Sequence, residues 1–288
     1  MTKRKKPLFL TGSSGKLGKA FLNALKEKEV FEKYHIVEYT SKDDLLNLPR
    51  LYEKMPEKAI IIHLAAKIEG DEKKAYDENI MFTKNLVKVA IEKNAEKIIF
   101  SSSCGVYGSR KGVVSETTEP APETKYEESK LMSEKIIINS KIPYTILRFP
   151  LLYPSKHIEK MINAIKKYRL LFRNSYWKML SYEDGGRALV FVLENDVEGT
   201  YNVVEEKGFY MEELYKTLGV DPVKVPSFFA NVFSFFFPNV LKKEWVKRLL
   251  RDRNYEGKKF YSLGYKPKNF FLDYIKSKNT KPTIKNIR

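Results

Sequence analysis

A phenol and an ammonium stand four residues apart at Tyr126 and Lys130, a spacing that places both on one face of a helix. A free tyrosine has a pKa of about 10 and is a poor base at neutral pH. A neighbouring cation favours the phenolate, which exchanges a proton with a substrate hydroxyl or carbonyl. Ser103 follows a predicted strand, where its hydroxyl would hydrogen-bond the reacting oxygen. These residue types indicate proton transfer at a substrate oxygen.

Three glycines follow the spacing Gly12-x-x-Gly15-x-x-Gly18 between a short apolar stretch and a helical pattern. Glycines permit a tight turn and a close approach of the backbone to a pyrophosphate, and a helix N-terminus favours its negative charge. A Walker-type ATP loop is excluded, because no Gly-Lys-Ser/Thr ends the run. The pattern predicts a dinucleotide cradle; an ordinary glycine-rich turn is the alternative.

Strand and helix patterns alternate through residue 150. We expect strands at 7–10, 35–39, 59–64, 97–100 and 144–148, and helices at 19–29, 71–92 and 124–139. The apolar residues 59–64 are typical of a parallel strand that is buried on both faces. The order predicts an α/β fold with a mostly parallel sheet wound on both faces.

Beyond residue 150 the pattern becomes irregular. We expect short helices at about 156–168, 184–194 and 210–217, with a strand near 200–204. The chain is therefore divided into a basic tail at 1–6, a sheet domain at 7–150, a smaller lobe at 151–275 that interleaves with it, and a basic, disordered tail at 276–288.

Positive charge is concentrated at the two ends of this 288-residue chain. Its 53 Lys and Arg and 36 Asp and Glu give +17, and residues 240–288 hold 15 of the former and 4 of the latter. Such ends suit an anionic partner, or they are simply solvated. We expect no nucleic acid, because no readout module accompanies the charge.

Composition excludes several classes of protein. A hydrophobic content of 43% excludes wholesale disorder, and one cysteine excludes an intramolecular disulfide or a multi-cysteine metal site. We therefore expect no metal. The sequence contains no uncharged apolar run of about 18 residues, so no membrane span is predicted, and no secretory signal is recognised. The default expectation is a cytoplasmic protein, with membrane association as the alternative.

The motifs occur together in a diagnostic order. Thr11 leads the glycines, His63-Leu-Ala-Ala follows the third strand, and Asn79, Ser103 and Tyr126-x-x-x-Lys130 come after it. This order resembles the extended short-chain dehydrogenases, the nucleotide-sugar epimerase/dehydratase family, strongly over 7–150 and more weakly to about 270. The resemblance implies a Rossmann-type doubly wound parallel sheet with a smaller C-terminal substrate-binding lobe.

The same resemblance implies roles for individual residues. Ser103, Tyr126 and Lys130 would be catalytic. Cofactor contacts would come from Gly12, Ser14, Gly15, Lys16, Leu17, Gly18, Leu64, Ala65, Ala66, Asn79, Ser101, Tyr126, Lys130 and Pro150. His63 is expected to be a packed residue at the end of a strand rather than a catalytic base.

The end of the second strand selects between the two nicotinamide cofactors. It reads Tyr39-Thr40-Ser41-Lys42. An acid there would bind the ribose diol of NAD, whereas the hydroxyl of Ser41 and the cation of Lys42 suit a 2′-phosphate. The resemblance and these residues therefore lead us to expect NAD(P) as the cofactor, with NADP favoured. By the resemblance, Asp44 (or Asp43) and Leu45 approach the adenine.

Departures from the family pattern narrow the substrate. Family dehydratases carry Asp-Glu after the catalytic Ser or Thr, where this chain has Cys104 and Gly105, so that dehydration route is not expected. Cys104 is either a second acid/base or a small buried residue. The run at 148–154 is similar to that of 4-keto-sugar reductase-like and sterol dehydrogenase-like members. Substrate contacts are expected from Cys104, Tyr153, Arg187 and Arg248, with Arg251 as the alternative to Arg248.

We therefore expect an NAD(P)-dependent oxidoreductase or epimerase that acts on a nucleotide-activated sugar, as a 4-epimerase or a 4-keto-sugar reductase. One alternative is a dehydrogenase of a sterol-like alcohol at a membrane surface, which the Phe-rich residues 228–237 and the basic residues up to 248 would contact. Those residues would otherwise form a lid or a dimer contact. A non-catalytic NADP-binding regulator is the other alternative. The resemblance also implies a homodimer through the helices at 71–92 and 124–139.

Overall fold

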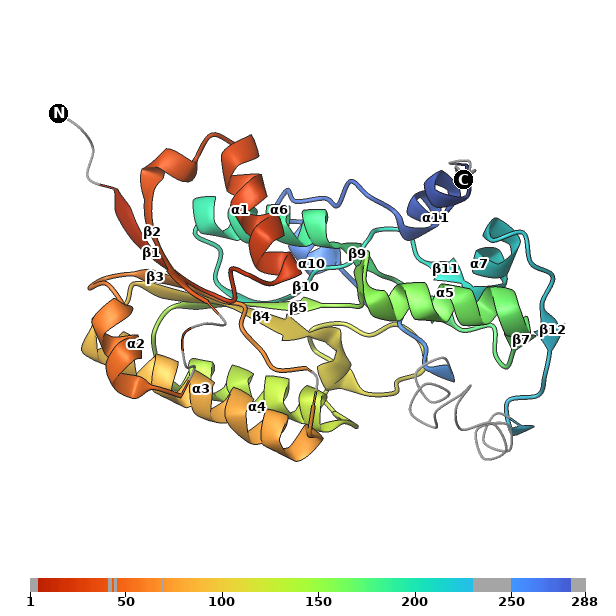
Figure 1. The fold of residues 1–288 in the computed structure, drawn as a ribbon, viewed down its shortest axis with the longest axis horizontal. Helices are drawn as coiled ribbons and strands as arrows, with labels where there is room; N and C mark the ends of the chain where they lie inside the picture. Colours follow the sequence, from red (N-terminus) through yellow and green to blue (C-terminus); the bar gives the residue numbers. More distant parts are fainter. Residues whose placement is uncertain (1–4, 41–42, 44–45, 69, 230–249, 281–288) are drawn as a thin grey trace, which may run out of the picture.

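A six-stranded parallel sheet forms the centre of the molecule (Figure 1). The structure, a computed structural model, describes residues 5–40, 43, 46–68, 70–229 and 250–280. The strands lie in the order β10-β5-β4-β3-β1-β2. Their bounds are β1 Lys6–Thr11, β2 Tyr34–Tyr39, β3 Ile60–His63, β4 Lys97–Ser103, β5 Tyr144–Phe149 and β10 Gly199–Asn202. The carboxyl ends of parallel strands meet at one edge, where ligands of such sheets bind.

Helices cover both faces of the sheet, which confirms the doubly wound fold. One face carries α1 (Lys16–Glu27) and α6 (Tyr182–Glu194), and the other carries α2 (Leu48–Lys54), α3 (Glu72–Glu92) and α4 (Lys125–Asn139). Each face buries its own apolar core. The helix α2 was missed by the sequence prediction.

Side-chain caps determine where the site-bearing helices begin. The Asp71 carboxylate accepts a hydrogen bond from Lys74 N at the start of α3. Thr124 and Glu127 form a reciprocal capping box at the start of α4, which satisfies backbone N–H groups in its first turn. The caps fix the first turns of the two helices that border the site.

Two elements of the expected lobe belong to the sheet layer instead. β10 pairs with β5, and α6 packs on α1. A Cβ on Gly186 would lie 2.5 Å from the backbone of Ala20, so only glycine allows this approach of α6 to α1. The boundary between the sheet domain and the lobe is thus interleaved rather than sharp.

The remaining lobe is small and packs around its own apolar cluster. Its helices are α5 (Lys156–Tyr168), α7 (Met211–Thr217) and α11 (Phe271–Thr280), and α10 (Lys258–Tyr261) lies against β10. Its short strand pairs are β6 (Leu152–Tyr153) with β9 (Leu180–Ser181), β7 (Leu170–Leu171) with β12 (Val223–Lys224), and β8 (Tyr176–Trp177) with β11 (Phe209–Tyr210). Short 3₁₀ helices occupy Phe31–Lys33 and Cys104–Tyr107.

The predicted start of the disordered tail at residue 276 is wrong. Residues 276–280 continue α11, whose Phe271 and Ile275 are buried in the lobe core and hold the helix in place. Residues 281–288 lie outside the described part. Among the described residues, no helix has the length and apolar character needed to cross a membrane.

Candidate active site

The turn between β1 and α1 is closed tightly by its glycines. Gly12 has a φ of +76°, and a Cβ there would lie 2.7 Å from Ala65 N at the end of β3. A Cβ on Gly18 would lie 2.4 Å from Gly12 O. Backbone alone therefore forms this wall at the start of α1, as close approach of a pyrophosphate requires.

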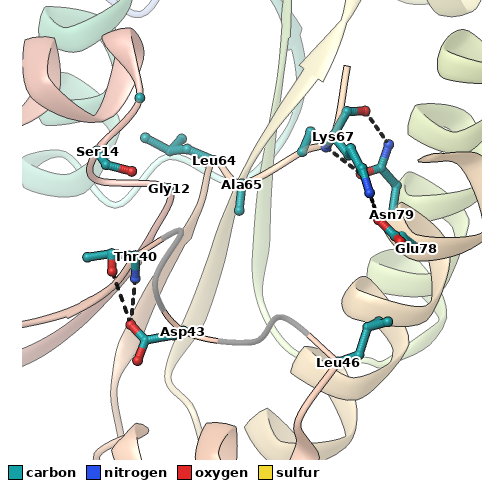
Figure 2. A pocket seen from close by; sticks show the side chains of 12 residues that line it. Gly12, Ser14, Thr40, Asp43, Leu46, Leu64, Ala65, Lys67, Glu78 and Asn79 are labelled. Atoms are coloured by element: carbon teal, nitrogen blue, oxygen red, sulfur yellow. Dashed lines mark hydrogen bonds and ion pairs between the residues drawn. The ribbon is translucent and has the colours of Figure 1, made fainter. Parts of the chain in front are cut away.

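A cavity of about 470 Å³ opens beside this turn (Figure 2). Its lining residues are Gly12, Ser14, Gly15, Thr40, Asp43, Leu46, Leu64, Ala65, Ala66, Lys67, Glu78 and Asn79. The small side chains at its centre and the glycine wall fit a dinucleotide. Prediction from sequence missed four of the lining residues: Thr40, Leu46, Lys67 and Glu78. Two of them could have been predicted from their neighbours, because Lys67 follows the Ala65-Ala66 motif and Glu78 precedes Asn79.

Asn79 holds one rim of the cavity (Figure 2). Its Oδ1 accepts from Lys67 N at 2.8 Å, and its Nδ2 donates to Lys67 O at 3.0 Å. The Lys67 ammonium pairs with Glu78 at 2.6 Å. Asn79 therefore fixes the chain that follows β3, and its amide is directed at that backbone.

Asp43 lies at the opposite end of the cavity, beyond β2. Its carboxylate accepts hydrogen bonds from Thr40 N at 2.8 Å, Arg50 Nε at 2.8 Å and Lys54 Nζ at 2.7 Å. Burial opposes ionisation, but the hydrogen bonds from Lys54, Thr40 and Arg50 outweigh it and hold the Asp43 pKa well below its usual range. This carboxylate is turned toward protein cations. Ser41, Lys42, Asp44 and Leu45 lie outside the described residues.

The structure brings Tyr126 and Lys130 together beside the end of β4. Lys130 Nζ donates to Ser101 O at 2.7 Å and lies 6.0 Å from the centre of the Tyr126 ring. Ser103, the last residue of β4, accepts from Gly105 N at 3.0 Å, which leaves its hydroxyl hydrogen for another acceptor. A Cβ on Gly105 would touch both Ser103 Oγ, at 3.0 Å, and Glu127 Cγ, at 2.8 Å. Ser103 thus borders the turn of α4 that carries Tyr126.

Burial changes the acidity of both groups. It lowers the pKa of Lys130 to about 7, an effect that the nearby Glu134 carboxylate partly offsets. It raises the pKa of Tyr126 above its ordinary value, and Tyr182 and Glu127 add to the rise. The expected bias of Tyr126 toward phenolate is therefore not seen in the protein alone, which holds the protonated phenol.

Four further residues predicted to contact a cofactor do not line the dinucleotide cavity. Lys16 Nζ donates to Pro154 O at 2.8 Å and lines a second cavity between α1 and α6. Leu17 is buried in the core beneath α6. Ser101 accepts Lys130 through its carbonyl, and Pro150 directly follows β5.

The structure contradicts two substrate contacts. Cys104 is fully buried, its thiol donates to Arg148 O at 3.2 Å, and burial raises its pKa, so it is neither a substrate contact nor an acid/base. Tyr153 is 2% exposed and packs on Phe271 and Tyr274 in the lobe core. Cys104 is covered by its own apolar cluster, which includes Val106, Tyr107 and Val114, and Tyr153 is covered by the lobe core of which it is part.

The predicted arginines also have protein partners. Arg187 pairs with the buried carboxylate of Asp184 at 2.7 Å and lines the second cavity beside Lys16. Arg251 pairs with Glu123 at 2.7 Å and Glu127 at 2.6 Å, so the expectation that it pairs with substrate phosphates is wrong. Arg248 lies outside the described residues.

His63 is packed beneath the cradle, as expected. It is 1% exposed, its Nδ1 lies 2.9 Å from Thr11 Oγ1, and its Nε2 lies 3.3 Å from Thr83 Oγ1. Thr83 Oγ1 donates to Asn79 O, and Thr11 Oγ1 accepts from the N–H groups of Leu64 and Ala65. Burial lowers the His63 pKa to about 3, so this hydrogen-bonded chain contains a neutral imidazole.

Replacing His63 by Asn is expected to remove a pH dependence of stability. The folded pKa of about 3 lies below the ordinary 6.5, so stability is fully present above pH 6.5 and is lost as the pH falls toward 3. Relative to the variant, the wild type should lose about 2 kcal/mol of unfolding free energy between pH 7 and pH 5. Urea unfolding at several pH values measures this, and a constant difference would contradict it.

The fold and the glycine turn together define a Rossmann-type nucleotide-binding protein, with the glycine turn and the end of β4 at the carboxyl edge of one parallel sheet. The family model described as the NAD dependent epimerase/dehydratase family matches residues 8–204. The chain belongs to this family, and its cofactor is NAD(P).

Individual relatives agree with this assignment. The chain is 26% identical over 233 residues to N-acetyl-α-D-glucosaminyl-diphospho-ditrans,octacis-undecaprenol 4-epimerase of Escherichia coli O157:H7, covering 72% of this chain and 70% of the relative. The fold of this chain is similar to that of UDP-glucuronic acid 4-epimerase from Bacillus cereus in complex with NAD (TM-score 0.71, 19% identity, covering 94% and 96% of the two chains). It is also similar to dTDP-4-dehydrorhamnose reductase from Bacillus anthracis in complex with NADP (TM-score 0.69, 20% identity, 95% and 98%).

Proposed function

We propose that the protein oxidises or reduces C4 of a sugar carried on a diphosphate, preferably a nucleotide-activated sugar, as a 4-epimerase or a 4-keto-sugar reductase. The observation that carries the proposal is the placement of Ser103, Tyr126 and Lys130 at the end of β4 and the start of α4, at the same carboxyl edge of the parallel sheet as the glycine turn that follows β1. The names of the E. coli, B. cereus and B. anthracis proteins all specify chemistry at position 4.

Each side chain has a separate task in this chemistry. A bound nicotinamide would accept or supply a hydride at its own C4. Ser103 donates a hydrogen bond to the sugar oxygen, because its Oγ already accepts from Gly105 N. Tyr126 donates its phenolic proton to that oxygen during reduction and takes the proton back during oxidation. Protonated Lys130 stabilises the phenolate that forms, and its anchoring on Ser101 O fixes its place.

We also propose NADP as the preferred cofactor. The Ser41 and Lys42 side chains follow β2, where a 2′-phosphate would be bound. The described carboxylate at this end, Asp43, already binds Arg50 and Lys54, so it is not directed at a ribose diol. Arg50 and Lys54 together carry two positive charges against the one negative charge of Asp43, so the local net charge favours an additional phosphate. A lower Kd for NADP than for NAD is expected in calorimetry, and the reverse order would contradict the preference.

Cofactor retention tests the reaction type. Mass spectrometry of the freshly purified protein measures the nicotinamide nucleotide per chain. An epimerase regenerates its cofactor internally, so near-stoichiometric retention supports that activity. An empty protein that binds NADPH reversibly supports the reductase. A protein that binds neither NAD(H) nor NADP(H) would contradict the proposed function.

A lipid-linked sugar is a second candidate substrate, favoured by an exposed aromatic pair. Phe228 and Phe229 are 67% and 42% exposed, and their ring centres lie 4.2 Å apart. The E. coli relative is named for a substrate on diphospho-undecaprenol. Sedimentation with anionic vesicles tests this, comparing the wild type with the Phe228→Ser/Phe229→Ser variant. Equal, negligible sedimentation of both would contradict membrane contact.

A homodimer through α3 and α4 is proposed as the assembly. Both helices carry large apolar side chains that are exposed in the single chain, namely Met81, Ile91, Met132 and Ile138. Burial of such side chains against a second copy would stabilise a dimer. Sedimentation velocity that shows only monomer at micromolar concentration would contradict this.

A further inference from the structure

A segment within the lobe sequence, before α10, connects the lobe to the start of the catalytic helix. Residues 250–256, here termed the strap, lie between β8 and the loop that contains Val114. Arg253 N donates to Tyr176 O at 2.7 Å, and Glu256 N donates to Val114 O at 2.7 Å. Trp177 Nε1 donates to Arg251 O at 3.0 Å. The strap is therefore fixed on both sides by hydrogen bonds.

Arg251 reaches from the strap to two carboxylates. Its Nη1 lies 2.6 Å from Glu127 Oε1, its Nη2 lies 2.7 Å from Glu123 Oε2, and its side chain is 7% exposed. A planar guanidinium that donates to two acids at once holds them at a fixed separation, and burial limits screening by solvent. The ion pairs therefore hold Glu123 and Glu127 in one arrangement.

Glu127 is also the central residue of the helix cap. Its Oε2 accepts from Glu123 N at 2.9 Å and Thr124 N at 3.1 Å, while Glu127 N donates to Thr124 Oγ1 at 3.2 Å. First helical turns fray unless their backbone groups are satisfied. Tyr126 lies in this turn, immediately before Glu127, so the position of its hydroxyl depends on the cap.

Glu127 borders the other catalytic element as well. A Cβ on Gly105 would lie 2.8 Å from Glu127 Cγ and 3.0 Å from Ser103 Oγ, so these groups share one small space. A displacement of the Glu127 side chain would therefore disturb Tyr126 and the Ser103 turn together. Misplacement of a catalytic group by about 1 Å lowers rates by about 10²-fold.

We propose that Arg251 is a positioning residue, which holds Glu127 and so sets Tyr126 and Ser103 in the geometry for proton transfer. This inference rests on the proposed function. It assigns Arg251 to the catalytic helix rather than to a substrate phosphate. It also makes the strap a mechanical connection between the substrate lobe and the site.

Variants of Arg251 test this, with Arg173→Met as the matched control. Arg173 binds the same strap, through Asp252 Oδ2 at 2.5 Å and Leu250 O at 3.1 Å, and both of these partners lie on the strap rather than on α4. Arg251→Met is expected to lower kcat about 30-fold or more, and Arg251→Lys about 10-fold or less. The KM for the sugar and the Kd for the cofactor should stay within about twofold. Arg173→Met should retain kcat within about twofold.

Hydrogen exchange supplies a readout that needs no substrate. Amides of residues 125–130 should exchange faster in Arg251→Met than in the wild type or Arg173→Met. An unchanged kcat overturns the proposal, whether or not exchange rises, and so does a rise in KM alone. If Arg251→Met does not fold, Arg251→Lys and Glu123→Gln, which weaken single contacts, decide in the same way. If the wild type converts no sugar, the proposed function fails. The exchange rates then still show whether Arg251 orders the first turn of α4.

Discussion

Replacing Tyr126 by Phe is expected to lower kcat for the sugar reaction by about 10³-fold, because a positioned acid/base contributes about 10²–10⁴-fold. The phenol lies beside the buried Lys130 in the first turn of α4, and no ring volume is lost in the variant. The free energy of unfolding should therefore change little. Steady-state kinetics with a nucleotide sugar and circular dichroism melting measure both quantities.

The matched control is Tyr76→Phe on α3, a half-buried phenol near the Lys125 ammonium that has no part in the proposed chemistry. It should retain kcat within about twofold of the wild type. A Tyr126→Phe variant as active as this control would overturn the catalytic assignment. It would favour a protein that binds the cofactor without using it.

Breaking the Glu134–Arg148 pair is expected to cause the largest loss of stability. Arg148 binds Glu134 through Nε at 3.0 Å and Nη2 at 2.7 Å, and both side chains are buried. Removing one partner leaves an uncompensated buried charge, which costs about 3–5 kcal/mol. Glu134→Leu or Arg148→Met should therefore lower Tm by about 10 °C.

The double variant Glu134→Leu/Arg148→Met should recover most of that loss, since a buried ion pair replaced by apolar groups is often neutral. Glu32→Ala provides the control, because Glu32 pairs with Lys5 at the surface, where both side chains are largely exposed. Calorimetric melting of the four proteins and the wild type completes the cycle. Additive losses in the double variant would contradict the account of the pair.

The sheet and its helices were predictable because local patterns carry them. Residues 59–64 are apolar throughout, and the predicted strand there became β3, while the helices at 71–92 and 124–139 became α3 and α4 within a residue. The helix α2 was missed because its seven residues show no complete apolar stripe. The end of order predicted at residue 276, inside α11, has a similar cause, because the Lys-rich sequence around it hides two buried residues, Phe271 and Ile275.

The site was predictable where motifs set it and unpredictable where tertiary contacts do. The glycine turn and the Tyr126–Lys130 pair follow from spacing along one element. The partners of Arg251 and Arg187 depend on which carboxylates the fold brings near, and the burial of Tyr153 depends on α11. The raised pKa of Tyr126 likewise follows from burial, which a spacing does not reveal.

The fate of a deuterium at C4 of the sugar tests the central claim most directly. The measurement follows UDP-N-acetylglucosamine labelled at C4, or its 4-epimer, by mass spectrometry and NMR after incubation with the protein and NADP⁺ or NAD⁺. The account predicts that the label stays on carbon, either at C4 of the epimerised sugar or at C4 of the reduced nicotinamide. Loss of the label to water during conversion would contradict it.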